Sequence, residues 1–274
     1  EDGIRDCLLS RGLGDVYKRQ LLILMSGSVL AGSASEKFQP HRAFYKMTMG
    51  SSKSSSGIIG VDGRMIFEWR STCDAYIVEQ RYMMRYQREE GTETNTDTEF
   101  STLENKDGEL YKFFVKNKLS DKSSNIEGVA KYSSKYRAGK VNYKSPRKTQ
   151  YKLPHNTMFP SNHTFYLIDA AKDQKKFLVV PVFDGSEIQT AISVSSVIGT
   201  EKVLEDPKHP LLSGKYWPIR MAFFSADQKA NSPTHEMTVN LHENGVSGDL
   251  VLDYFDFKVD MKLVKIEEIK RPHC

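Results

Sequence analysis

The side chains that most often perform catalysis or bind metals are dispersed along this 274-residue chain. It contains no Gly-x-Ser-x-Gly, Gly-x-Gly-x-x-Gly or His-Glu-x-x-His motif and no phosphate-binding P-loop. No two of its seven histidines have the i, i+4 spacing that places two metal ligands on one helix face. Ser193, Ser195 and Ser196 lie in an alternating segment that is typical of a strand. We therefore predict no catalytic residue, no metal site and no cofactor; a hydrolase with a dispersed site is the less favoured alternative.

Charged side chains form two kinds of local cluster. The adjacent carboxylates Glu89-Glu90 and Glu267-Glu268 are typical of solvated surface. Basic residues gather in the range 144–152, close to Lys140. This basic cluster suits an edge strand protected by lysines, and it also suits binding of an anionic head group or nucleic acid. We favour edge protection and predict no nucleic-acid partner, because a net charge of +4 is small for that class.

The first 35 residues are predicted to lie outside the folded domain. Residues 1–20 show no sustained period and end in a stretch that resembles translated cloning-adapter sequence, so we predict a non-native extension. Residues 21–35 follow a basic flank and combine an apolar run with small residues, which is the layout of a cleaved signal peptide. The apolar run is too short to span a bilayer as a helix. The sequence therefore predicts export.

Export determines how the three cysteines are interpreted. Cys7 lies in the predicted leader, which leaves Cys73 and Cys274 as an even pair. Exported chains fold in an oxidising compartment, where disulfides form and persist. We therefore predict a disulfide between Cys73 and Cys274, which would join an early strand to the last residue of the chain.

Period-two alternation dominates the rest of the chain and predicts strands of an antiparallel sheet. Asp-Gly and Asn-Gly turns near residues 107 and 244 are hairpin signals. The predicted strands cover residues 41–49, 57–70, 75–87, 92–104, 109–119, 126–132, 140–143, 176–183, 190–198, 216–224, 236–242, 249–260 and 261–269.

One segment has helical spacing instead. Ser161 is a plausible N-cap, and the apolar residues that follow fit a helix of about three turns. About a dozen strands and one helix predict a mainly β single domain over residues 36–274. A sheet of this size must curl into a barrel or divide into a sandwich. The 14 Phe, 13 Tyr and 2 Trp are enough to line the interior of an open barrel or to pack a core.

Several short motifs follow one another in an order and spacing that resemble the EipB family, periplasmic cell-envelope-integrity proteins of alphaproteobacteria. The motifs precede and follow Cys73 and end at Cys274, so the likeness covers the chain from about residue 41 onward. They are His41-Arg42-Ala43-x-Tyr45, Gly60-Val61-x-Gly63-Arg64-Met65, Lys215-Tyr216-Trp217-Pro218-Ile219, Glu243-Asn244-Gly245 and Asp253-Tyr254-x-Asp256-Phe257.

The resemblance implies a many-stranded antiparallel sheet curled into an open β-barrel or β-spiral, with the helix near Ser161 in its hollow. It implies a disulfide at the positions of Cys73 and Cys274. It also implies a periplasmic location and no established catalytic residues. The implied role is to maintain envelope integrity under stress through periplasmic protein partners of unknown identity.

Two non-enzymatic functions remain open from the sequence. The first is an interaction protein with periplasmic protein partners, and the second is a carrier or sensor of an apolar or lipid ligand. A mean hydropathy of −0.51 excludes a polytopic membrane protein. We expect a deep apolar hollow for a carrier and a hollow filled by side chains for an interaction protein.

Overall fold

The structure is a computed structural model that describes residues 33–135, 137–226 and 232–274. The predicted extension, Cys7 and most of the predicted signal peptide lie outside these ranges. The described elements are α1 (Ala34–Lys37), β1 (His41–Ser52), η1 (Ser54–Ser56), β2 (Ile58–Ser71), β3 (Ala75–Arg88), β4 (Glu93–Asn105), β5 (Leu110–Leu119), β6 (Lys122–Ser133), β7 (Ala138–Ser145), β8 (Thr149–Leu153), α2 (Pro160–Lys172), β9 (Phe177–Val182), β10 (Ile192–Ile198), β11 (Lys202–Val203), η2 (Pro210–Leu212), β12 (Lys215–Phe224), β13 (His235–His242), β14 (Ser247–Asp253) and β15 (Phe257–Glu268).

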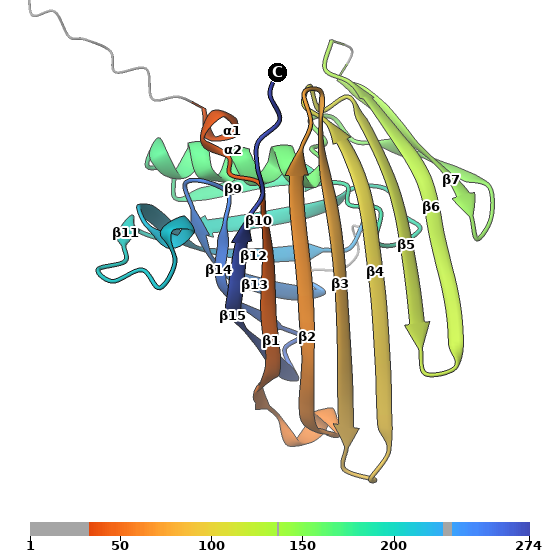
Figure 1. Cartoon of the computed structure of the whole chain (residues 1–274). Coiled ribbons are helices and arrows are strands. Elements are labelled where there is room, and N and C mark those ends of the chain that lie inside the picture. Colours follow the sequence, from red (N-terminus) through yellow and green to blue (C-terminus); the bar gives the residue numbers. More distant parts are fainter. Residues whose placement is uncertain (1–32, 136, 227–231) are drawn as a thin grey trace, which may run out of the picture. The chain divides into compact units, whose positions relative to one another are not determined.

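All fifteen strands of the described ranges belong to one antiparallel sheet. Its path runs β8-β7-β6-β5-β4-β3-β2-β1-β15-β14-β13-β12-β10-β9, and β11 pairs with β12 beside this path. In Figure 1 the long strands β2 to β6 form one side of the sheet, and the later strands curl round behind them. The path ends at β8 and β9 without joining them, so the sheet is curled but not closed. The predicted fold class, a mainly β open barrel with a helix, is confirmed.

Strand boundaries differ from the prediction near the C-terminus. The expected division between residues 260 and 261 is wrong, because β15 runs unbroken from Phe257 to Glu268. The turn lies earlier, where Phe255 has a φ of 69° and its N–H donates to Asp253 Oδ1. This turn contains neither Gly nor Pro, and its signal is the weaker one of Asp253, whose side chain accepts a hydrogen bond from the backbone two residues on.

The predicted helix α2 is present, but its N-terminus is satisfied differently. Ser161 lies inside the first turn, after Phe159 at the N-cap and Pro160 at the first helical position, so its assignment as N-cap is wrong. The Glu104 carboxylate on β4 takes this role. It accepts the Ser161 N–H at 2.7 Å and the Asn162 N–H at 2.9 Å, and the Asn162 side-chain amide donates to it at 2.6 Å. A distant strand therefore caps the helix.

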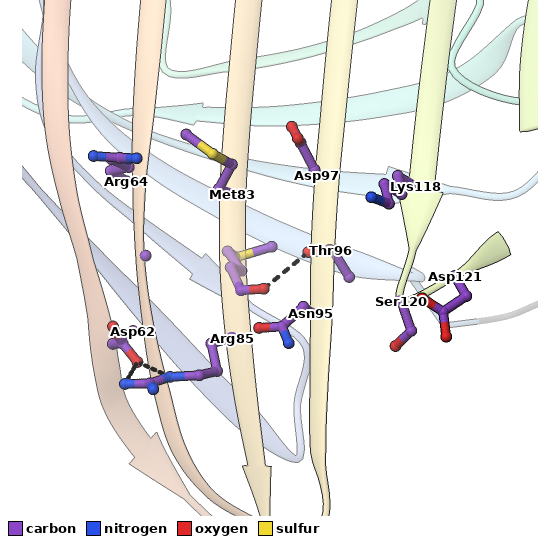
Figure 2. A pocket seen from close by; sticks show the side chains of 12 residues that line it. Asp62, Arg64, Met83, Arg85, Asn95, Thr96, Asp97, Lys118, Ser120 and Asp121 are labelled. Carbon is purple, nitrogen blue, oxygen red and sulfur yellow. Dashed lines mark hydrogen bonds and ion pairs between the residues drawn. The ribbon is translucent and has the colours of Figure 1, made fainter. Parts of the chain in front are cut away.

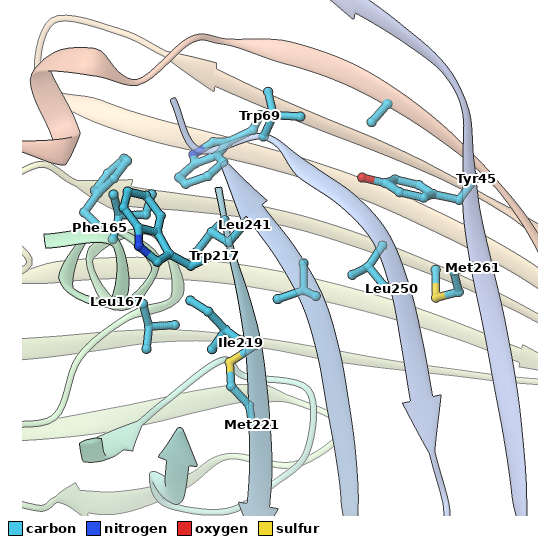
Figure 3. Close-up of a cluster of buried hydrophobic side chains, with 14 of the residues drawn as sticks. Tyr45, Trp69, Phe165, Leu167, Trp217, Ile219, Met221, Leu241, Leu250 and Met261 are labelled. Carbon is cyan, nitrogen blue, oxygen red and sulfur yellow. The ribbon is translucent and has the colours of Figure 1, made fainter. Parts of the chain in front are cut away.

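The largest core cluster surrounds α2 on the concave side of the sheet. Phe165 of the helix stacks on Trp69 of β2 with ring centroids 5.3 Å apart. Figure 3 shows Trp217 and Leu241, from the later strands, in the same cluster. Helix and strand side chains therefore pack against one another on the concave side of the sheet.

A second cluster bridges the two ends of the sheet. Tyr143 of β7 donates its hydroxyl to the carbonyl oxygens of Glu187 and Gln189, in the loop after β9. The Thr190 hydroxyl from the same loop donates to the Lys152 carbonyl at 2.5 Å. Side chains, rather than a backbone ladder, therefore hold β8 and the β9–β10 loop together. The buried members are Tyr111, Phe113, Ala130, Tyr132, Val141, Tyr143, Leu153, Phe159, Phe183 and Ala191.

Candidate functional surfaces

The predicted cysteine pair forms a disulfide in the structure. Cys73 lies in the turn between β2 and β3, and Cys274 is the last residue, with Cα atoms 5.6 Å apart and a sequence separation of 201. The segment before Cys274 also contacts α1, because the Arg271 guanidinium donates to the carbonyl oxygens of Glu36 and Lys37. The disulfide therefore fixes the C-terminus beside both an early strand and the first described helix.

Serines and metal-ligating side chains are the candidates for chemistry in this sequence. Within the described ranges, no group of three or more His, Cys, Asp or Glu side chains is placed to hold a metal ion. Ser193 and Ser195 lie on the outward side of β10, whereas Ser196 points inward and is buried. No helix of the described ranges combines the length and apolar character needed to cross a membrane.

His163 is a buried titratable group on α2. Its side chain is buried, and its Nε2 has no hydrogen-bond partner among the described residues. Burial lowers the pKa of His163 from 6.5 to about 4. The unfolded chain therefore binds a proton at a higher pH than the folded chain does. It follows that stability is lost as the pH falls from about 6.5 towards 4.

We expect the His163→Leu variant to resist acid better than the wild type. Between pH 7 and pH 5, the free energy of unfolding of the wild type should fall by about 2 kcal/mol more than that of the variant. Urea denaturation at the two pH values measures this difference. The exposed His155→Gln variant is the control and should keep the wild-type pH dependence. Parallel behaviour of wild type and His163→Leu would contradict the assignment.

A cleft of about 800 Å³ lies on the outward face of β2 to β5. Figure 2 shows that charged side chains line it, with Arg85 beside Asp62. The Arg85 Nε donates to Asp62 Oδ2 at 2.8 Å, and both side chains are about half exposed. A hydrogen bond from Arg81 lowers the pKa of Asp97, so this carboxylate stays ionised. These are solvated ion pairs rather than a perturbed acid and base poised for catalysis.

A second groove, of about 440 Å³, lies on the outward face of β3 to β7. Its lining includes the apolar side chains of Ile77, Leu103 and Phe114, and Phe114 is exposed. Lys112 and Lys144 belong to the same lining, and Lys144 Nζ lies 2.7 Å from Glu127 Oε1. This groove therefore combines an apolar surface with cationic side chains.

An exposed apolar patch lies on the outward face of β9 and β10. Phe177 is directly opposite Val197 in the strand pairing, and Val179 is two residues along β9. The three side chains are 60%, 53% and 55% exposed, respectively. The sequence predicts both strands but not this patch, although the alternation of Phe177 and Val179 along one strand is a usable signal. We call these three residues the β9–β10 patch.

A curled, unclosed antiparallel sheet around a buried helix defines a barrel-like β protein. The sequence profile of the EipB-like family matches residues 33–270, so the chain belongs to this family. It is 31% identical over 254 residues to a protein named "Cell envelope integrity protein EipB" from Brucella abortus (strain 2308), with 88% of each chain covered. It is also similar to a crystal structure of a beta-barrel-like protein of domain of unknown function DUF1849 from Brucella abortus. That similarity has a TM-score of 0.78 and 27% identity, and covers 85% of this chain and 99% of the other.

Proposed function

We propose that this protein maintains cell-envelope integrity in the periplasm as a non-enzymatic protein that acts through a protein partner. The observation that carries the proposal is the 31% identity to the Brucella protein that is named for cell-envelope integrity. The surfaces of the protein agree with this proposal. The cleft on the outward face of β2 to β5 contains solvated ion pairs, and α2 packs on the concave side of the sheet. Export with cleavage of the leader remains part of the proposal.

The β9–β10 patch is the proposed contact with the partner. Apolar side chains that are more than half exposed and lie next to one another are a feature of interaction surfaces. Phe177 is aromatic, and aromatic side chains are enriched at protein interfaces. The patch also lies next to the end of the sheet, where no further strand of the described ranges pairs along β9 beyond the single bridge to Met158.

The alternative function is a carrier of an apolar or lipid ligand, and it needs space inside the sheet. The concave side instead contains α2, of which Leu167, Ile168 and Ala170 are buried against the strands. This packing favours the interaction protein. Native mass spectrometry of the protein purified from its host tests the alternative, and a bound lipid that survives delipidation controls would support it.

The partner contact can be tested by removing the patch. We expect the Phe177→Ser/Val197→Ser variant to recover the partner at least about tenfold less well than the wild type after cross-linking in the periplasm, since each buried apolar side chain contributes about 1.5–3 kcal/mol. The measurement is quantitative mass spectrometry of proteins cross-linked to the tagged chain.

The matched control removes two equally exposed apolar side chains elsewhere. Ile59 and Val264 are 54% and 63% exposed, and neither lies on β9 or β10. The Ile59→Ser/Val264→Ser variant should keep the partner at the wild-type level. Equal recovery by all three proteins would exclude the patch as the contact, and recovery of no periplasmic protein by the wild type would exclude the proposed mode of action.

A further inference from the structure

The positive charge of the chain is concentrated in one part of the sheet. Residues 110–153, which form β5 to β8, contain twelve Lys and Arg but only two Asp and Glu, a net charge of +10. The whole chain carries +4, so the remaining residues together carry −6. The chain therefore combines one strongly basic segment with a remainder that is mildly acidic.

Strand register places three lysines of this segment directly opposite one another. Lys131 on β6 pairs with Lys140 on β7, and Lys140 pairs with Lys152 on β8. The side chains are exposed on the outward face, because the alternate residues Val141 and Leu153 are buried on the other face. Like charges directly opposite in an antiparallel pair are destabilising. We call these three residues the lysine row; an anionic surface lying across it would offset the repulsion.

The lysine row has no acidic partner in the part of the chain that the structure describes. Within the described ranges, none of its members lies within 4.0 Å of a carboxylate oxygen. Glu127 is ion-paired instead with Lys144, four residues after Lys140 on β7. Edge protection accounts for Lys152, which lies on the edge strand β8. It does not account for Lys131 and Lys140, whose strands pair with neighbours on both sides. The row therefore needs another explanation.

The residue types favour a lipid surface over a protein as the anionic partner. Protein interfaces are enriched in arginine and depleted in lysine, and geometrically specific carboxylate recognition uses the planar guanidinium. The row contains lysines alone, whereas the outward arginines Arg81 and Arg85 of β3 are both ion-paired with Asp side chains. The groove that Ile77, Leu103 and Phe114 line on the same face supplies apolar surface beside the cations.

We propose that the outward face of β5 to β8 is a docking surface for an anionic phospholipid bilayer, with the lysine row against the head groups. Phosphate groups would lie across Lys131, Lys140 and Lys152, and the exposed Phe114 would face the interfacial region. This inference rests on charge and strand register and is independent of the protein partner at the β9–β10 patch. The proposed docking puts the outward face of β5 to β8 against the membrane surface.

Sedimentation with lipid vesicles tests the proposal. The wild type should bind vesicles that contain phosphatidylglycerol and phosphatidylcholine, and not vesicles of phosphatidylcholine alone. Binding should weaken as the salt concentration rises. For Lys131→Gln/Lys140→Gln/Lys152→Gln we expect the partition coefficient to fall by about 100-fold, about fivefold for each lysine near the surface. Its melting temperature should not fall, because the substitutions remove like-charge pairs.

The matched control removes the same charge from elsewhere. Lys46, Lys202 and Lys262 are exposed, lie outside residues 110–153 and make no ion pair within the described ranges. The Lys46→Gln/Lys202→Gln/Lys262→Gln variant should keep most of the binding. Equal losses in both triple variants would overturn the docking surface and indicate a response to net charge alone. Failure of the wild type to prefer anionic vesicles would overturn the proposal outright.

A second measurement needs no variant. Acetylation by an amine-reactive reagent, read by mass spectrometry, should slow at Lys131, Lys140 and Lys152 when anionic vesicles are present. It should be unchanged at Lys46 and Lys262. If the lysine row reacts at the same rate with and without anionic vesicles, this face does not contact the bilayer and the proposal is wrong.

Discussion

Reduction of the Cys73–Cys274 disulfide should lower the melting temperature by about 10 °C. The bond closes a loop of 201 residues. The chain-entropy treatment gives about 5 kcal/mol for a loop of this length, as an upper value because residual structure in the denatured state reduces it. For a domain of this size, each kcal/mol corresponds to a few degrees. Thermal melting monitored by circular dichroism, with and without reductant, measures the change.

Cysteine variants separate the bond from other effects of reductant. Cys73→Ser/Cys274→Ser should melt at the temperature of the reduced wild type and should not respond to reductant. His273→Ser is the matched control, since the exposed His273 is next to Cys274 but is not part of the bridge, and it should respond to reductant as the wild type does. Identical melting of the wild type in oxidising and reducing buffer would contradict a stabilising role for the disulfide.

Glu104→Ala should destabilise the protein by about 3 kcal/mol. The carboxylate is 1% exposed and accepts three hydrogen bonds at the N-terminus of α2. Its burial raises the pKa of Glu104, and the hydrogen bonds from Ser161 and Asn162 lower it, so the donors offset part of the cost of a buried charge. Removing the side chain leaves the first turn of the helix without its acceptor. Urea denaturation at neutral pH measures the loss.

Two further variants test the reason for this loss. Glu104→Gln replaces one acceptor oxygen with an amide that cannot accept, so we expect an intermediate loss of about 1–2 kcal/mol. Glu93→Ala, on an exposed position of the same strand, should change stability by less than about 0.5 kcal/mol. A Glu104→Ala variant as stable as Glu93→Ala would show that Glu104 does not cap α2.

Period-two alternation was sufficient to predict most of the strands, because one face of nearly every strand is buried. Tyr45 and Met47 on β1, for example, are buried where the alternation expects them. The strand ends were less predictable. The start of β6 at Lys122 and its neighbours is exposed on both faces, so no apolar period marks it. Its pairing partner β5 determines its length instead.

The candidate sites were harder to predict, because they depend on pairing between distant segments. The cap of α2 comes from Glu104, 57 residues before Ser161, and local spacing cannot indicate such a contact. The lysine row likewise exists only in the register of three strands, although its lysines are visible in the sequence. The disulfide was predictable, since Cys73 and Cys274 are the single pair of cysteines outside the predicted leader.

The most direct test of the account is complementation of a deletion strain under envelope stress. Deletion of the gene should sensitise the host to detergent and to cell-wall inhibitors. The wild-type chain and the Ile59→Ser/Val264→Ser control should restore growth, whereas Phe177→Ser/Val197→Ser, exported at the same level, should not. A deletion strain that survives these stresses as well as its parent would contradict the role in envelope integrity, and full rescue by the patch variant would contradict action through the β9–β10 patch.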